Sequence, residues 1–93
     1  MRRAARTDAN HAAIVRELRQ CGLAVLDLSR VGQGCPDLLV ASRRSDLQVL
    51  VEVKTAKGKL TPDELEFFED WPGPLRIVAR CAEDVLAWFE ARE

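Results

Sequence analysis

The first apolar pattern in the chain has helical spacing. Ile14, Leu18 and Cys21 recur at helical spacing between about residues 8 and 21, with arginine and glutamine on the opposite side. We therefore predict an amphipathic helix over residues 8–21. Thr7 or Asp8 is expected to be its N-cap residue, since either side chain can accept a hydrogen bond from the first turn.

Short apolar runs bounded by glycine, proline or polar residues predict strands at residues 23–28, 37–42, 47–54 and 75–79. A polar turn of four residues joins the second strand to the third, so these two are expected to run antiparallel. A helical pattern separates the third strand from the fourth, which implies a parallel crossover. The chain is therefore predicted to be α/β, with a mixed central β-sheet flanked by helices.

Two further helices are predicted in the second half of the chain. Thr61 is a good N-cap residue, Pro62 fits the first helical position and Glu64 completes a capping box. The helix that starts there should end near residues 71–74, where tryptophan precedes Pro-Gly-Pro. A final helix is predicted over residues 82–92.

Charged residues interrupt the second and third apolar strands. Because side chains alternate along a strand, Glu52 and Lys54 should point to the same face of the sheet. A four-residue hairpin loop would place Ser42 opposite Leu47, and the same register then places Asp37 opposite Glu52. The two carboxylates would have Cβ atoms about 5 Å apart.

Two carboxylates this close destabilise a fold unless their charge is neutralised. A divalent cation is the natural neutraliser, because aspartate and glutamate supply the hard oxygen ligands that Mg²⁺ and Mn²⁺ prefer. Lys54 adds a positive charge beside the pair. Such a site can polarise a phosphodiester and lower the pKa of a bound water, so hydrolysis of a nucleic acid backbone is the reaction that fits.

The length of the chain, 93 residues, is that of one domain covering residues 1–93. The longest apolar runs are only a few residues long, so we expect no membrane span and a cytoplasmic protein. Three cysteines without a CxxC pair predict neither disulfides nor a zinc site, and favour small buried side chains. His11 has no evident partner and is expected on the surface.

The net charge of −1 is distributed unevenly. Residues 1–59 contain 11 Lys/Arg and 6 Asp/Glu, hence +5, whereas residues 60–93 contain 3 and 9, hence −6. A polyanion should therefore meet the first two-thirds of the chain. Arg30, Lys57 and Lys59 lie there in glycine-containing loops and are candidates for contacts with DNA phosphates. A solvated surface side chain is the alternative for each.

The charged strands resemble a known motif. Pro36-Asp37 is followed by Glu52-Val53-Lys54, in the element order helix, three strands, helix, strand. This order resembles the PD-(D/E)xK nuclease superfamily, and the segment 34–40 together with Leu60-Thr61-Pro62 is similar to the VRR-NUC family within it. The resemblance covers nearly the whole chain. It implies a restriction-endonuclease-like αβββαβα fold.

The resemblance also implies roles for individual residues. Asp37 and Glu52 would ligate Mg²⁺ or Mn²⁺, and the backbone carbonyl of Val53 would complete the protein ligands. Lys54 would orient or activate the attacking water. Glu17 matches the helical acidic residue that helps many family members to bind metal, directly or through water; a solvated glutamate is the alternative.

Stand-alone VRR-NUC members of viral and bacterial origin are associated with homodimeric cleavage of four-way (Holliday) junctions. The resemblance therefore implies a DNA endonuclease that works as a homodimer in a bacterial or virus-infected host cell. As a separate hypothesis, surplus apolar surface on the last two helices supplies the dimer interface. The alternatives are a non-catalytic nucleic-acid-binding module, or a nuclease for flaps, nicks or RNA. Glu64 stands where the family often has glutamine, and its capping role accounts for it adequately.

Overall fold

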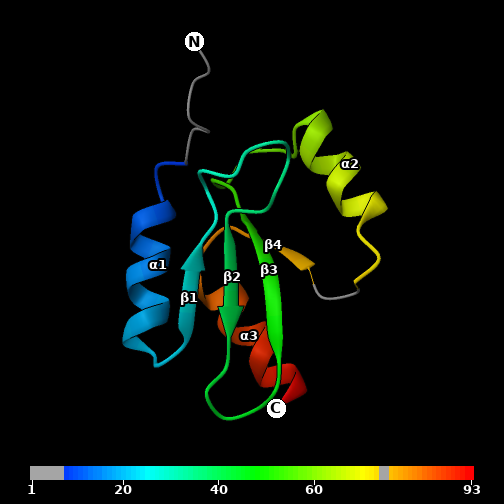
Figure 1. The fold of residues 1–93 in the computed structure, drawn as a ribbon. Coiled ribbons are helices and arrows are strands. Elements are labelled where there is room, and N and C mark those ends of the chain that lie inside the picture. Colours follow the sequence, from blue (N-terminus) through cyan, green and yellow to red (C-terminus); the bar gives the residue numbers. More distant parts are fainter. Residues whose placement is uncertain (1–7, 74–75) are drawn as a thin grey trace.

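The computed structural model describes residues 8–73 and 76–93. Its elements follow one another along the chain as α1 (His11–Gln20), β1 (Ala24–Asp27), β2 (Leu38–Ala41), β3 (Gln48–Val53), α2 (Pro62–Asp70), β4 (Arg76–Ala79) and α3 (Ala82–Arg92) (Figure 1). This confirms the predicted α/β, restriction-endonuclease-like order αβββαβα. Residue 75, predicted to begin the last strand, lies outside the described residues. No helix in the described ranges is both long and apolar enough to cross a lipid bilayer.

The sheet has the order β1-β2-β3-β4, in which β3 and β4 are parallel and the other neighbours are antiparallel. The predicted hairpin register is confirmed. The amide of Ser42 donates to the carbonyl of Leu47 at 3.1 Å, and Leu38 lies opposite Val51. One step further along the same register, Asp37 comes opposite Glu52.

One face of the sheet carries the hydrophobic core, which α1 and α3 cover together. Alternate residues of β2 and β3 point into it, as strand geometry requires. Its fully or nearly fully buried members include Leu18 of α1, Leu38 and Val40 of β2, Val49, Val51 and Val53 of β3, and Val85 and Phe89 of α3. The opposite face therefore receives the intervening residues, among them Glu52.

Helix α2 lies over that opposite face, and none of its residues is buried. Its start is as predicted: Thr61 is the N-cap residue and forms a capping box with Glu64. Polar contacts tie α2 to the sheet, such as the 2.7 Å bond from Arg76 Nε to the carbonyl of Phe68. Its half-buried apolar residues are Phe67 and Phe68, and Phe67 lines a pocket together with Leu39 and Leu50 of the sheet.

Two predictions are wrong: the N-cap residue of α1 and the burial of the cysteines. Helix α1 begins at His11 with Asn10 as its N-cap residue, so Asp8 does not cap it, and Thr7 lies outside the described residues. Cys21 and Cys81 are exposed rather than buried, because they occupy the C-cap of α1 and the N-cap of α3, and Cys35 is half-buried. All three are free thiols.

Candidate active site

A break in the β2–β3 ladder forms the centre of the site. Ladder bonds recur at every second pair from Ser42–Leu47, so beyond Leu38–Val51 the next such pair would be Pro36–Val53. Pro36 has no N–H to donate to the Val53 carbonyl. The amide of Val53 instead donates to Asp37 Oδ2 at 2.8 Å. Because the N–H and C=O of a strand residue point to the same side, the Val53 carbonyl faces the same edge as the Asp37 carboxylate.

Glu52 lies beside Asp37 and is only 2% exposed. Burial, and then the negative charge of Asp37, raise the pKa of Glu52 to about 9. Burial also raises the pKa of Asp37, although the Val53 amide opposes this effect. Glu52 Oε1 has no hydrogen-bond partner among the described residues. A buried carboxylate oxygen without a partner, next to a second carboxylate, suits a divalent cation.

Lys54 is the positive charge of the site and is 8% exposed. Its Nζ lies 2.7 Å from Glu64 Oε1 and 3.7 Å from Glu52 Oε2. Burial alone would lower the pKa of Lys54, but the hydrogen bond and charge of Glu64, together with Glu52, raise it instead. In this arrangement Lys54 is an ammonium group that can donate a hydrogen bond but cannot accept a proton.

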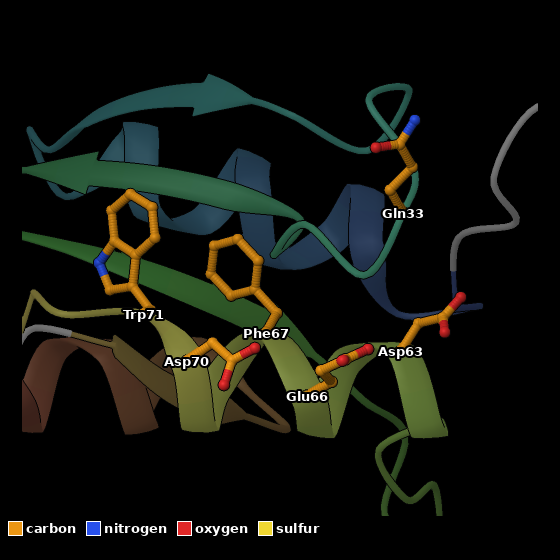
Figure 2. Close-up of a pocket in the computed structure, with 6 residues that line it drawn as sticks. All are labelled: Gln33, Asp63, Glu66, Phe67, Asp70 and Trp71. Atoms are coloured by element: carbon orange, nitrogen blue, oxygen red, sulfur yellow. The ribbon is translucent and has the colours of Figure 1, made fainter.

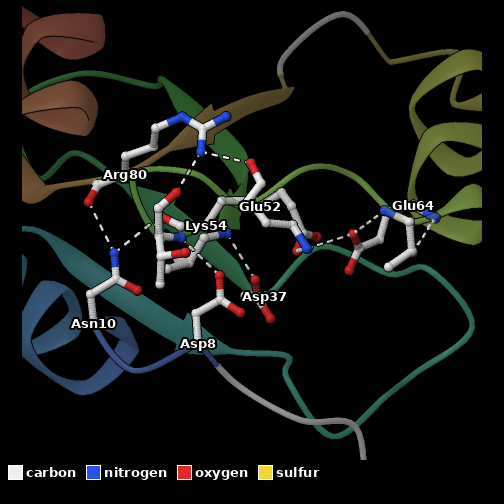
Figure 3. A network of polar contacts seen from close by, with 11 residues as sticks. Asp8, Asn10, Asp37, Glu52, Lys54, Glu64 and Arg80 are labelled. Carbon is white, nitrogen blue, oxygen red and sulfur yellow. Dashed lines mark hydrogen bonds and ion pairs between the residues drawn. The ribbon is translucent and has the colours of Figure 1, made fainter.

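The backbone around Lys54 is held by three residues whose role here the sequence reasoning missed, namely Asn10, Asp8 and Arg80 (Figure 3). Asn10 Nδ2 donates to the carbonyls of Lys54 at 3.1 Å and of Arg80 at 2.9 Å. Asp8 Oδ2 accepts a 2.9 Å bond from the amide of Thr55. These partners lie far away along the chain, so no local pattern could have indicated them.

The guanidinium of Arg80 fixes the turn that follows Lys54. It donates to the carbonyl of Gly58 at 2.8 Å and to that of Thr55. Lys57 and Lys59 are exposed on this turn, and Arg30 is exposed on the loop before β2. The three candidate DNA contacts thus remain predictions, with side chains free to reach a ligand.

Glu17 lies apart from this cluster. It is exposed on α1, seven residues beyond Asn10, which corresponds to about 10 Å along the helix axis. Within the described residues, no three histidine, cysteine, aspartate or glutamate side chains are grouped as a metal site. The Val53 carbonyl and water are therefore the natural partners of Asp37 and Glu52 around a metal. A role for Glu17 stays a prediction.

His11 is buried, contrary to the sequence expectation. Its Nε2 lies 3.1 Å from Asp27 Oδ2, and Nε2 carries the proton because an ionised carboxylate only accepts. Asp27 Oδ1 accepts from both the amide and the hydroxyl of Ser29. Partial burial alone would raise the pKa of Asp27, but these hydrogen bonds outweigh it and lower the pKa to about 2.

Replacing Asp27 by asparagine should lower the melting temperature at pH 7. Because the folded pKa lies below the ordinary 3.8, the stability that Asp27 contributes is present above pH 4 and is lost as the pH falls towards 2. Thermal unfolding between pH 2 and pH 7 should therefore show the gap between wild type and Asp27→Asn closing at the acid end. Asp46→Asn, at an exposed turn residue, should show no gap. A constant gap for Asp27→Asn would contradict this account.

At Gly34 the loop before Asp37 packs closely against the start of α2. Its φ is +79°, and a Cβ there would lie against the carbonyl oxygen of Asp63 and 2.7 Å from its carbonyl carbon. Both atoms belong to the backbone, so the loop and α2 would have to separate. Gly22 is the matched control, because it has a φ of +90° but nothing within 4 Å of a Cβ.

We expect Gly22→Ala to destabilise the protein by about 1–2 kcal/mol through its left-handed backbone alone. Gly34→Ala should destabilise it by about 2 kcal/mol more, because overpacking is added to the same backbone strain. Urea unfolding of the two variants checks this difference. Equal losses would mean that the contact between the loop and α2 yields without strain.

A pocket of about 430 Å³ lies between the loop and α2 (Figure 2). Asp63, Glu66 and Asp70 line it together with Gln33 and the stacked rings of Phe67 and Trp71. Its carboxylates would repel a phosphate backbone. This side of α2 is therefore unsuited to binding DNA. The turn with Lys57 and Lys59 carries positive charge and is suited to it.

A family model described as the VRR-NUC domain matches residues 4–72 of the chain. The matched segment contains Asp37, Glu52, Lys54 and Glu64, whereas Arg80 lies beyond its end. No curated protein and no solved structure matches the chain significantly.

Proposed function

Because this chain belongs to the VRR-NUC domain family, and thus to a nuclease superfamily, we propose that it is a Mg²⁺- or Mn²⁺-dependent endonuclease that hydrolyses DNA phosphodiester bonds. The observation that carries this proposal is the β2–β3 register, which brings Asp37 opposite Glu52 with Lys54 at the end of the same strand. Two carboxyl groups placed so close together destabilise a fold unless their charge is neutralised, and a divalent cation would do so.

Each residue of the site has a defined part in the proposal. Asp37, Glu52 and the Val53 carbonyl would hold the metal, since they supply oxygen donors at one edge of the sheet. When bound there, it would supply Lewis-acid chemistry to a phosphodiester and its attacking water. Lys54 donates a hydrogen bond that orients the attacking water and offsets the charge that develops on the phosphoryl oxygens.

The charge distribution supports an approach of DNA over the turn that follows β3. Lys57 and Lys59 are exposed there, and Arg30 is exposed on the loop before β2. The acidic side of α2 should repel DNA phosphates and so limit the approach on that side. Contacts with phosphates position a duplex without reading its sequence, so we propose recognition of DNA structure rather than of bases.

We further propose that the DNA is a four-way junction and that the enzyme is a homodimer, since symmetric cleavage of two strands requires two sites. The expected interface needs revision, because the apolar side chains of α3 fill the core. The exposed large apolar side chains include Leu65 and Trp71 on and after α2, and Leu26 on β1. A pocket of about 490 Å³ between the sheet and α2 adds to this surface.

One experiment compares four-way junctions, flaps, nicked duplex, linear duplex, single strands and RNA as substrates in Mg²⁺ and in Mn²⁺. The proposal expects preferred, symmetric incision of the four-way junction. Preference for another substrate would replace the junction, and binding without cleavage would point to a non-catalytic binding module. Sedimentation at micromolar concentration should give a dimer, and a monomer there would contradict the two-site model.

A further inference from the structure

Glu64 performs two tasks with one oxygen atom. Its Oε1 accepts a 2.8 Å hydrogen bond from the amide of Thr61 and pairs with Lys54 Nζ at 2.7 Å. The first contact belongs to the capping box that starts α2. The second reaches across to the end of β3 and is not needed to start a helix.

The backbone of Lys54 is held on both sides. Its amide donates to the carbonyl of Ala79 at 3.0 Å, and its own carbonyl accepts from Asn10. The next peptide is fixed in turn, because the Thr55 amide donates to Asp8 and the Thr55 carbonyl accepts from Arg80. With the backbone fixed, the position of the ammonium depends on the torsions of the long Lys54 side chain (Figure 3).

Glu64 is the nearer of the two carboxylates that hold this ammonium. At 2.7 Å its contact with Lys54 has the length of a strong charge-assisted hydrogen bond, whereas Glu52 lies at 3.7 Å. The Glu64 side chain is 18% exposed, so the pair is shielded from solvent more than a surface ion pair. Glu64 therefore sets the position of the Lys54 ammonium more than Glu52 does.

We propose that Glu64 is a positioning residue, which holds the Lys54 ammonium beside the Asp37–Glu52 pair from the first turn of α2. The catalytic part of this inference rests on the proposed nuclease function, and the contact itself does not. The ion pair with Lys54 and the close approach of Gly34 to Asp63 both hold α2 in place. A shift of α2 would therefore also move Glu64 relative to Lys54.

Three variants separate positioning from helix capping. Glu64→Ala removes both contacts. Glu64→Gln keeps an oxygen that can accept from both Thr61 and Lys54, and glutamine also supports a capping box. Thr61→Ala weakens the cap and leaves the Glu64 carboxylate in place.

The kinetic measurement uses a cleaved DNA substrate at saturating Mg²⁺. Glu64→Ala should lower kcat about 10- to 100-fold with KM nearly unchanged, because a misplaced catalytic group affects the chemical step. Glu64→Gln should recover most of kcat, and Thr61→Ala should melt earlier but cleave within about threefold of wild type. Equal losses of kcat in Thr61→Ala and Glu64→Ala would overturn the proposal in favour of a capping role, and so would a change confined to KM.

A second measurement does not depend on cleavage. Acetic anhydride labels accessible lysine amines, and mass spectrometry of the peptides follows each lysine separately. Lys54 should be protected in wild type and Thr61→Ala but labelled several-fold faster in Glu64→Ala, with the exposed Lys57 as internal reference. Equal labelling of Lys54 in all three proteins would overturn the inference. If Lys54 of wild type is protected in this way but wild type cleaves no DNA, the proposed nuclease function is refuted and the contact between Glu64 and Lys54 is still supported.

Discussion

Replacing Lys54 by alanine is expected to lower the rate of DNA cleavage by about 10²- to 10⁴-fold, the range typical of removing a group that acts on the transition state. Lys54 is nearly buried, and two carboxylates keep its amine protonated. In the proposed reaction, its charge would offset the negative charge that develops on the phosphoryl group. Because Asp37 and Glu52 remain in place, binding of Mg²⁺ should be retained.

Single-turnover cleavage and Mg²⁺ calorimetry measure these two properties separately. Arg43→Ala is the control, because it removes one positive charge from the exposed hairpin turn at the far end of β2 and β3. It should cleave at the wild-type rate. Lys54→Ala with wild-type cleavage would assign Lys54 a structural role, and loss of Mg²⁺ binding in this variant would show that it serves the metal site instead.

Replacing Glu52 by glutamine is expected to stabilise the metal-free protein while preventing metal binding. Glu52 is buried beside Asp37, and its Oε1 has no partner among the described residues. Removing the buried carboxyl group beside the partly buried Asp37 should stabilise the fold by on the order of 1–3 kcal/mol. In a domain of this size that corresponds to a rise in melting temperature of about 5 °C or more.

The stabilisation by Glu52→Gln should depend on pH. The folded pKa of Glu52 is about 9 against an ordinary 4.5, so the folded protein retains a proton that the unfolded chain releases. The stability gained from that proton is fully present below pH 4.5 and is lost as the pH rises towards 9. Melting in EDTA should therefore show the advantage of Glu52→Gln growing from pH 5 to pH 9.

Mg²⁺ should reverse the order of the two melting temperatures, so that wild type melts above Glu52→Gln. A metal held by Asp37 and Glu52 would bind only the folded wild type, so the melting temperature of wild type should rise with Mg²⁺ concentration, whereas that of Glu52→Gln should not. A Glu52→Gln protein that melts below wild type in EDTA would mean that the carboxylate stabilises the fold without a metal. A Mg²⁺ response equal to that of wild type would remove Glu52 from the ligand set.

The parts of this structure that sequence reasoning predicted are governed by local rules. The four-residue turn fixes the β2–β3 register, and strand alternation then sets Asp37 against Glu52. The capping box of Thr61 and Glu64 marks the start of α2 in the same local way. Both predictions need only residues within about one turn or one hairpin, and both are confirmed.

The parts that could not be predicted depend on contacts between distant segments. Asn10 bonds the carbonyl of Arg80, 70 positions away, and Asp8 bonds Thr55, 47 positions away. His11 is buried because β1 brings Asp27 to it, which its helical position alone does not indicate. The pairing of Glu64 with Lys54 likewise requires that α2 fold back over the sheet, so the capping motif gave no sign of it.

We propose that the Asp37–Glu52 pair makes this chain a metal-dependent DNA nuclease, and one measurement tests this most directly. Wild type and Glu52→Gln are incubated side by side with a four-way junction and a linear duplex, in Mg²⁺, in Mn²⁺ and in EDTA. We predict cleavage by wild type in either metal, none in EDTA, and none by Glu52→Gln under any of these conditions. Cleavage that survives EDTA, cleavage by Glu52→Gln at the wild-type rate, or DNA binding by wild type without cleavage in either metal would contradict the claim.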